Sequence, residues 1–151
     1  MTGSNPEVDS LVEANLQTFK ESVRSFLSVA QMICDGYTVQ EFEIFIFRVK
    51  EFLTRLREEA SVAGFTEEQF NEMQYALCAF FDERILKADV KENSSGFTPQ
   101  PLQSSLFDEH LAGQGFFERL TALRSDSWRC IEVLEVYYLC LVQGFKGRYV
   151  N

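Results

Sequence analysis

The residues of this chain best suited to acid–base chemistry are two neighbouring carboxylates, Asp82 and Glu83, and the single histidine, His110. A small helical hydrolase or ligand-binding bundle could bring all three into one pocket, with the histidine in hydrogen-bond reach of one carboxylate, directly or through one water. However, no nucleophile and orienting group stand around His110 at a recognisable spacing. A histidine at the surface or at a helix end is therefore favoured, and the hydrolase or ligand-binding bundle is the alternative.

Asp82 belongs to a stretch, residues 75–88, that is apolar almost all the way round and is predicted to form a central, buried helix. At about 100° per residue, Asp82 shares one side of this helix with Tyr75, Cys78 and Leu86. An ionised carboxylate in such an apolar stripe is costly unless it is paired, hydrogen-bonded or placed in a cleft. Asp82 is therefore expected to do more than keep the protein soluble.

Glu83 lies on a third side of the same helix, one turn before Lys87, where an ion pair at the surface can form. The two neighbouring acids thus have different surroundings. Two interpretations of the pair stay open. Asp82 and Glu83 bind a partner, or the carboxylate of Asp82 ties two helices together through an arginine or backbone amides.

Other patterns that could hold a metal or a cofactor lack the required spacing. The cysteines show no C-x-x-C pair and stand in apolar helical contexts, as expected of buried thiols in a reducing compartment; they are Cys34, Cys78, Cys130 and Cys140. Asp108-Glu109-His110 has no ligands at metal-site spacing, and Gly113-Gln114-Gly115 follows no strand and precedes no phosphate-binding lysine. We predict no metal and no cofactor.

Size and charge narrow the class of protein. A chain of 151 residues with 46% hydrophobic residues is long enough for one globular domain with a real core. Its net charge of −9 argues against nucleic acid as the main ligand and favours a basic or polar protein partner. No apolar run approaches the length of a membrane span, and the first residues lack the features of a signal peptide. A cytoplasmic domain is expected.

The first part of the chain, about residues 8–90, predicts three long helices in a bundle. Apolar residues recur every three or four positions, which is the spacing of a buried helix face. In the first helix they are Val12, Leu16, Phe19, Val23, Phe26, Ala30 and Ile33, and in the second Phe42, Phe45, Val49, Phe52 and Leu56. Gly36 and Gly64 are expected to end these helices, and Thr38-x-x-Glu41 and Thr66-x-x-Gln69 are capping boxes that start the next ones.

Residues 91–101 carry two of the chain's three prolines and no periodicity, so they predict a loop. The part that follows, residues 102–151, predicts a short helix over 104–111, a break at Gly113-Gln114-Gly115, and a helix over 116–124. Ser125-Asp126-Ser127 is expected to cap the last long helix. Its predicted buried face is Ile131, Leu134, Tyr138, Leu141 and Phe145. The predicted fold is all-α, with about six to eight helices in two small packed bundles.

Three segments together resemble the cytoplasmic domain of the DotU/TssL family. Proteins of this family are inner-membrane components of type VI secretion systems and, under the name IcmH, of type IVB secretion systems. The segments are Tyr75-Ala-Leu-Cys-Ala-Phe-Phe-Asp-Glu, Gly115-Phe-Phe-Glu and Tyr138-Leu-Cys-Leu-Val-Gln-Gly-Phe-Lys-Gly-Arg-Tyr149, of which the last is the most specific. The resemblance spans most of the chain. Residues 91–101 lack the tryptophan of the family, and Gly113-Gln114-Gly115 replaces its Gly-Gly, which leaves both the type VI and the type IVB subfamily open.

The resemblance implies a hook-like, all-helical domain at the cytoplasmic face of the bacterial inner membrane, 1–151, with a C-terminal transmembrane anchor expected beyond residue 151. It implies a non-catalytic scaffold that links an IcmF/TssM-type inner-membrane partner to cytoplasmic baseplate proteins of the TssK and TssE types. A homodimer of the full-length form fits this role, and nucleic acid does not. The family's acidic pair, near a cleft between the bundles, falls on Asp82 and Glu83, which become the candidate partner-binding residues.

Overall fold

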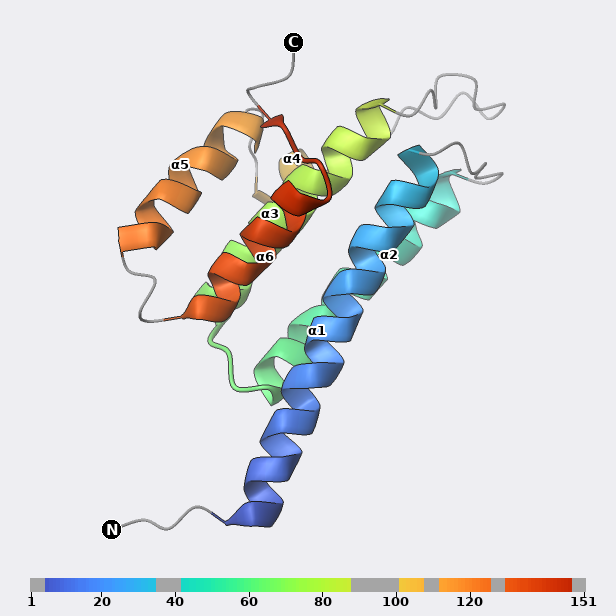
Figure 1. The fold of residues 1–151 in the computed structure, drawn as a ribbon. Helices are drawn as coiled ribbons and strands as arrows, with labels where there is room; N and C mark the ends of the chain where they lie inside the picture. The colour runs from blue at the N-terminus through green and yellow to red at the C-terminus, as the bar shows by residue number, and fades with distance from the viewer. Residues whose placement is uncertain (1–4, 35–41, 88–100, 108–111, 126–129, 148–151) are drawn as a thin grey trace.

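The computed structural model describes residues 5–34, 42–87, 101–107, 112–125 and 130–147 of the chain (Figure 1). Within these residues every regular element is a helix, which confirms the predicted all-α bundle. The helices are α1 (Pro6–Cys34), α2 (Phe42–Val62), α3 (Glu67–Lys87), α4 (Leu102–Phe107), α5 (Ala112–Ser125) and α6 (Ile131–Val142).

The central helix is α3, as predicted. It packs against all five other helices, with α1 and α2 on one side and α5 and α6 on the other (Figure 1). Every residue from Tyr75 to Phe81 is at most 2% exposed, because this stretch meets neighbours in all directions. The all-round apolar composition of α3 is therefore explained by its position between two layers of helices.

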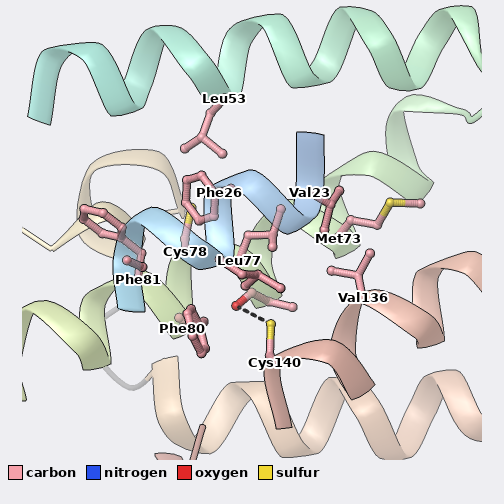
Figure 2. Close-up of a cluster of buried hydrophobic side chains, with 14 of the residues drawn as sticks. Val23, Phe26, Leu53, Met73, Leu77, Cys78, Phe80, Phe81, Val136 and Cys140 are labelled. Carbon is pink, nitrogen blue, oxygen red and sulfur yellow. Dashed lines mark hydrogen bonds between the residues drawn. The ribbon is translucent and has the colours of Figure 1, made fainter. Parts of the chain in front are cut away.

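The apolar faces of α1 and α2 meet α3 in one continuous core. Figure 2 shows part of it, with Val23 and Phe26 from α1, Leu53 from α2, and Met73 and Leu77 from α3. The predicted face of α1 is buried from Phe19 onward, whereas Val12 is 51% exposed. The prediction failed there because α1 begins at Pro6 and its first turns extend past the ends of its neighbours (Figure 1).

Local signals set the turn between α2 and α3 as expected. Gly64 has φ +99°, and the amides of Gly64 and Phe65 donate to the carbonyls of Ser61 and Ala60, which is the Schellman arrangement. The amide of Thr66 donates to Oε1 of Gln69 at 2.8 Å, and the amide of Gln69 donates to Oγ1 of Thr66 at 3.1 Å. This capping box is confirmed, whereas Thr38-x-x-Glu41 lies outside the described residues.

Three predicted boundaries in the second part of the chain are wrong. The short helix α4 starts two residues earlier than predicted, and its predicted end at residue 111 lies outside the described residues. Helix α5 starts at Ala112, so the Gly113-Gln114-Gly115 run forms its first turn instead of a break. The N-cap of α6 is Cys130, without a side-chain cap, while Ser125 belongs to α5 and its hydroxyl donates to the carbonyl of Ala122.

The predicted buried face of α6 is right for Leu134 and for Phe145 just beyond the helix, but wrong for Ile131 and Tyr138. Ile131 is 56% exposed and Tyr138 is 45% exposed. The buried residues of α6 are Val133, Leu134, Val136, Tyr137 and Cys140. Because α6 is apolar nearly all round, the spacing of its residues did not distinguish this face from its neighbour, and contacts with α3 decide it. One such contact is the thiol of Cys140, 3.7 Å from the carbonyl oxygen of Ala76 (Figure 2).

Candidate functional site

The candidate acidic residue Asp82 holds the start of α4. Its two carboxylate oxygens accept hydrogen bonds from the backbone amides of Leu102, at 2.7 Å, and Gln103, at 3.0 Å. The first amides of a helix have no partner within the helix, so a carboxylate placed there satisfies them. This is the geometry of the second interpretation, a carboxylate that ties two helices together through backbone amides. Its predicted stripe neighbour Leu86 is 82% exposed.

Burial raises the pKa of Asp82 from 3.8 to about 6. The hydrogen bonds from the amides of Gln103 and Leu102 act in the opposite direction, because they stabilise the ionised carboxylate. At neutral pH the carboxylate is therefore ionised and accepts both bonds. Below pH 6 it takes up a proton.

Glu83 holds the segment that follows α6. Its carboxylate accepts hydrogen bonds from the backbone amides of Lys146, at 3.0 Å, and Gly147, at 2.7 Å. The side chain of Glu83 is only 11% exposed. The loop after α6 therefore supplies partners of Glu83 that the sequence did not indicate, whereas the side chain of Lys87 lies outside the described residues and its ion pair with Glu83 stays a prediction.

Arg84 fixes the end of α6. Its side chain is 5% exposed, its Nη2 donates to the backbone carbonyl of Gln143, and its guanidinium lies 4.6 Å from the centre of the Phe80 ring. Gly144 follows with φ +103° and ends α6 in a second Schellman arrangement. A Cβ atom at Gly144 would lie 2.8 Å from Nη2 of Arg84, so glycine is required here both for its backbone conformation and for space.

Three consecutive residues of α3 thus bind three segments that follow much later in the chain. We call Asp82, Glu83 and Arg84 the backbone clamp. Each acidic residue uses both carboxylate oxygens on backbone amides, and Arg84 satisfies a carbonyl at the end of α6. The clamp fixes the positions of α4 and α6 against α3, and its acids are bound to the protein's own main chain.

Polar residues that the sequence interpretation missed form a second connection between α3, α5 and α6. Oε1 of Glu72 accepts a hydrogen bond from Arg119 at 3.0 Å, and Oε2 accepts one from the hydroxyl of Tyr137 at 3.4 Å. The Arg119 guanidinium lies 3.9 Å from the centre of the Tyr75 ring. Burial, followed by the charge of Glu72, raises the pKa of Tyr137. A buried tyrosine hydroxyl needs a hydrogen-bond partner. This requirement was the signal in the sequence that could have indicated the connection.

The remaining predicted sites are only partly described. His110 lies outside the described residues, so the pocket of Asp82, Glu83 and His110 is not brought together in the described structure. In the described ranges, no group of three or more His, Cys, Asp and Glu side chains is placed to hold a metal ion. None of the described helices is long and apolar enough to cross a membrane.

The all-helical fold and its backbone clamp define a helical bundle domain, and the comparisons assign its family. Residues 18–151 match the family described as type VI secretion system protein DotU, so the chain belongs to the DotU family. No curated protein matches the chain. The cytoplasmic domain of TssL from Acinetobacter baumannii is 29% identical, with a TM-score of 0.78 over 87% of this chain and 84% of that one.

A second solved structure supports the fold alone. The type VI secretion protein SciP/TssL from enteroaggregative Escherichia coli 042 is 23% identical, with a TM-score of 0.70 over 88% of this chain and 77% of that one. Family membership makes this chain a component of a secretion system and confirms the resemblance found in the sequence.

Proposed function

We propose that this chain is a non-catalytic scaffold of a type VI secretion system. In this role a helical domain links an IcmF/TssM-type inner-membrane protein to cytoplasmic baseplate proteins of the TssK and TssE types, and an anchor beyond residue 151 holds it at the inner membrane. Two findings support the proposal: the family match over residues 18–151, and the similarity to a cytoplasmic TssL domain.

The observation that carries the proposal is the backbone clamp. An acid or base that reacts with a substrate must direct its carboxylate at that substrate, whereas Asp82 and Glu83 direct both of their oxygens at amides of the main chain. We propose that the pair supports partner binding by fixing two surface segments, the start of α4 and residues 146–147. Helix α4 and the segment at residues 146–147 present exposed side chains, among them Leu106 near the end of α4 and Lys146.

The test measures binding and local structure on the same variants. In biolayer interferometry, the purified chain should bind TssK-, TssE- or TssM-type proteins of the same secretion system. Glu83→Gln should weaken at least one of these contacts about tenfold, and the amides of Lys146 and Gly147 should exchange faster with deuterated solvent, because glutamine carries no charge and offers one acceptor oxygen in place of two. Glu68→Gln, at an exposed carboxylate in the first turn of α3, is the matched control.

Two results would contradict the proposal. If none of the three proteins binds the wild-type chain, the scaffold role is wrong. If Glu83→Gln speeds exchange at residues 146–147 and leaves all binding unchanged, the clamp does not support the partner surface.

A further inference from the structure

The first turns of α1 are helical without packing against the rest of the protein. Asn5 caps the helix: its Oδ1 accepts the amide of Glu7 at 2.9 Å, and its carbonyl accepts the amide of Asp9 at 2.9 Å. Pro6 occupies the first helical position, where a missing amide hydrogen does no harm. Nevertheless, every residue from 5 to 14 is exposed, and in Figure 1 this end of α1 extends beyond all other helices.

This extension carries an apolar stripe. Val8 is 54% exposed, Leu11 61% and Val12 51%. At 100° per residue, Val8 and Val12 lie on the same side of α1 as Phe19, whose side chain is 2% exposed in the core. The face that holds α1 in the bundle thus continues into solvent for about three turns. We call Val8, Leu11 and Val12 the projecting stripe.

Acidic residues flank the projecting stripe on both sides. On the helical wheel Glu7 lies beside Leu11, while Asp9 and Glu13 lie on the other side of the stripe. No basic side chain occurs from residue 5 to residue 19; the first is Lys20. The extension is therefore an apolar surface with a negative border on each side.

The stripe leads into a groove between α1 and α6. One turn after Val12, the apolar lining begins with Leu16 and continues with Phe19 and Val23 of α1 and with Val136 and Leu139 of α6. Its rim has two cations and two anions, Lys20, Arg24, Glu132 and Glu135, and Lys20 lies 3.6 Å from Glu135. A helix bound to the projecting stripe could therefore extend into this groove. Because the charges on the rim of the groove balance, the preference for a basic partner comes from the acidic residues beside the stripe.

We propose that the projecting stripe is a docking site for a basic amphipathic helix of another protein. Such a helix would lay its apolar side on Val8, Leu11 and Val12 and set lysine or arginine side chains against the acids on both borders. A second copy of this chain would bring the same acids to the same surface. An anionic lipid surface or a nucleic acid would be repelled. The DotU family match begins at residue 18, so this site lies outside the matched residues.

The probe is a pair of synthetic peptides with leucine at the a and d heptad positions. One has lysine at its flanking positions, and the other has glutamate there. Fluorescence anisotropy with the whole chain should detect binding of the lysine peptide only, weakened by added salt. Leu11→Ser should reduce the affinity at least tenfold, and so should the double variant Glu7→Lys, Glu13→Lys.

Matched controls make the same changes elsewhere. Val62→Ser removes an apolar side chain that is 66% exposed at the end of α2, and Glu68→Lys reverses an exposed charge of α3. Both should leave peptide binding unchanged. Because the residues changed in α1 are also exposed, circular dichroism melts of all variants should match that of the parent.

Four outcomes would overturn the proposal. The first is no binding of the lysine peptide, and the second is equal binding of both peptides or equal loss in the control variants. The third is self-association in sedimentation velocity that Leu11→Ser abolishes, which assigns the stripe to a second copy. The fourth is binding to phosphatidylglycerol vesicles that Leu11→Ser abolishes, which assigns it to lipid.

Discussion

Replacing Gly144 by alanine should destabilise the protein far more than replacing Gly64. The two glycines are matched, because each ends a helix in a Schellman arrangement with φ near +100°. They differ in their surroundings. A Cβ atom at Gly64 meets nothing within 4 Å, whereas one at Gly144 would lie 2.8 Å from Nη2 of Arg84. The comparison therefore isolates the contribution that Arg84 of the backbone clamp makes to the free energy of unfolding.

The magnitudes follow from two terms. A left-handed conformation costs alanine about 1 to 2 kcal/mol, partly offset by about 0.4 to 1 kcal/mol from the lower entropy of the unfolded chain. Gly64→Ala should thus cost about 1 kcal/mol. At Gly144 the new methyl group must also displace the guanidinium that donates to Gln143, and a hydrogen bond to a charged group contributes about 1.5 to 3 kcal/mol. Gly144→Ala should cost about 3 kcal/mol.

The assay is urea unfolding followed by circular dichroism, with thermal melts as a second measurement. For a domain of this size, about 1 kcal/mol corresponds to about 2 to 4 °C in Tm. Gly64→Ala should lower Tm by about 3 °C and Gly144→Ala by about 6 to 12 °C. In an Arg84→Met background, Gly144→Ala should cost only about 1 kcal/mol, because the group it displaces is gone. Equal losses for both glycines, or an unchanged cost in that background, would refute the reasoning.

Two further predictions test the other parts of the structure. The pKa of Asp82 is about 6 in the folded protein and 3.8 in the free group, so protonation of Asp82 stabilises the folded state. This stabilisation is fully present below pH 3.8 and is lost as the pH rises through 6. The free energy of unfolding of the wild type relative to Asp82→Asn should therefore fall by about 2 to 3 kcal/mol from pH 4 to pH 7 in urea titrations, and parallel pH profiles would contradict this. Leu134→Ala should cost about 2 to 5 kcal/mol, because Leu134 is 4% exposed, whereas Tyr138→Ala, at 45% exposure, should cost less than half as much in the same assay. Equal costs would restore the face of α6 that the sequence predicted, because that face contains both residues.

The candidate acids illustrate how far a single sequence reaches. The helical wheel indicated that Asp82 could not remain ionised without hydrogen bonds or a cleft, and the structure supplies two backbone amides. The wheel did not identify them, because Leu102 and Gln103 follow 20 and 21 residues later in the chain. For Glu83 the local rule of pairing with Lys87 did not indicate the amides of Lys146 and Gly147, because they follow 63 and 64 residues later in the chain.

Local chemistry by itself determined the helical class, the apolar composition of α3, the capping box at Thr66 and the stop at Gly64. Each depends on residues within a few positions of one another, so the sequence contains the whole cause. Tertiary structure alone decided which side of α6 faces the core and at which residue α1 extends past the ends of its neighbouring helices. It also decided which backbone groups the clamp binds. Those outcomes depend on the lengths and relative positions of different helices, and a helix that is apolar nearly all round, such as α6, carries too little periodic signal to predict them.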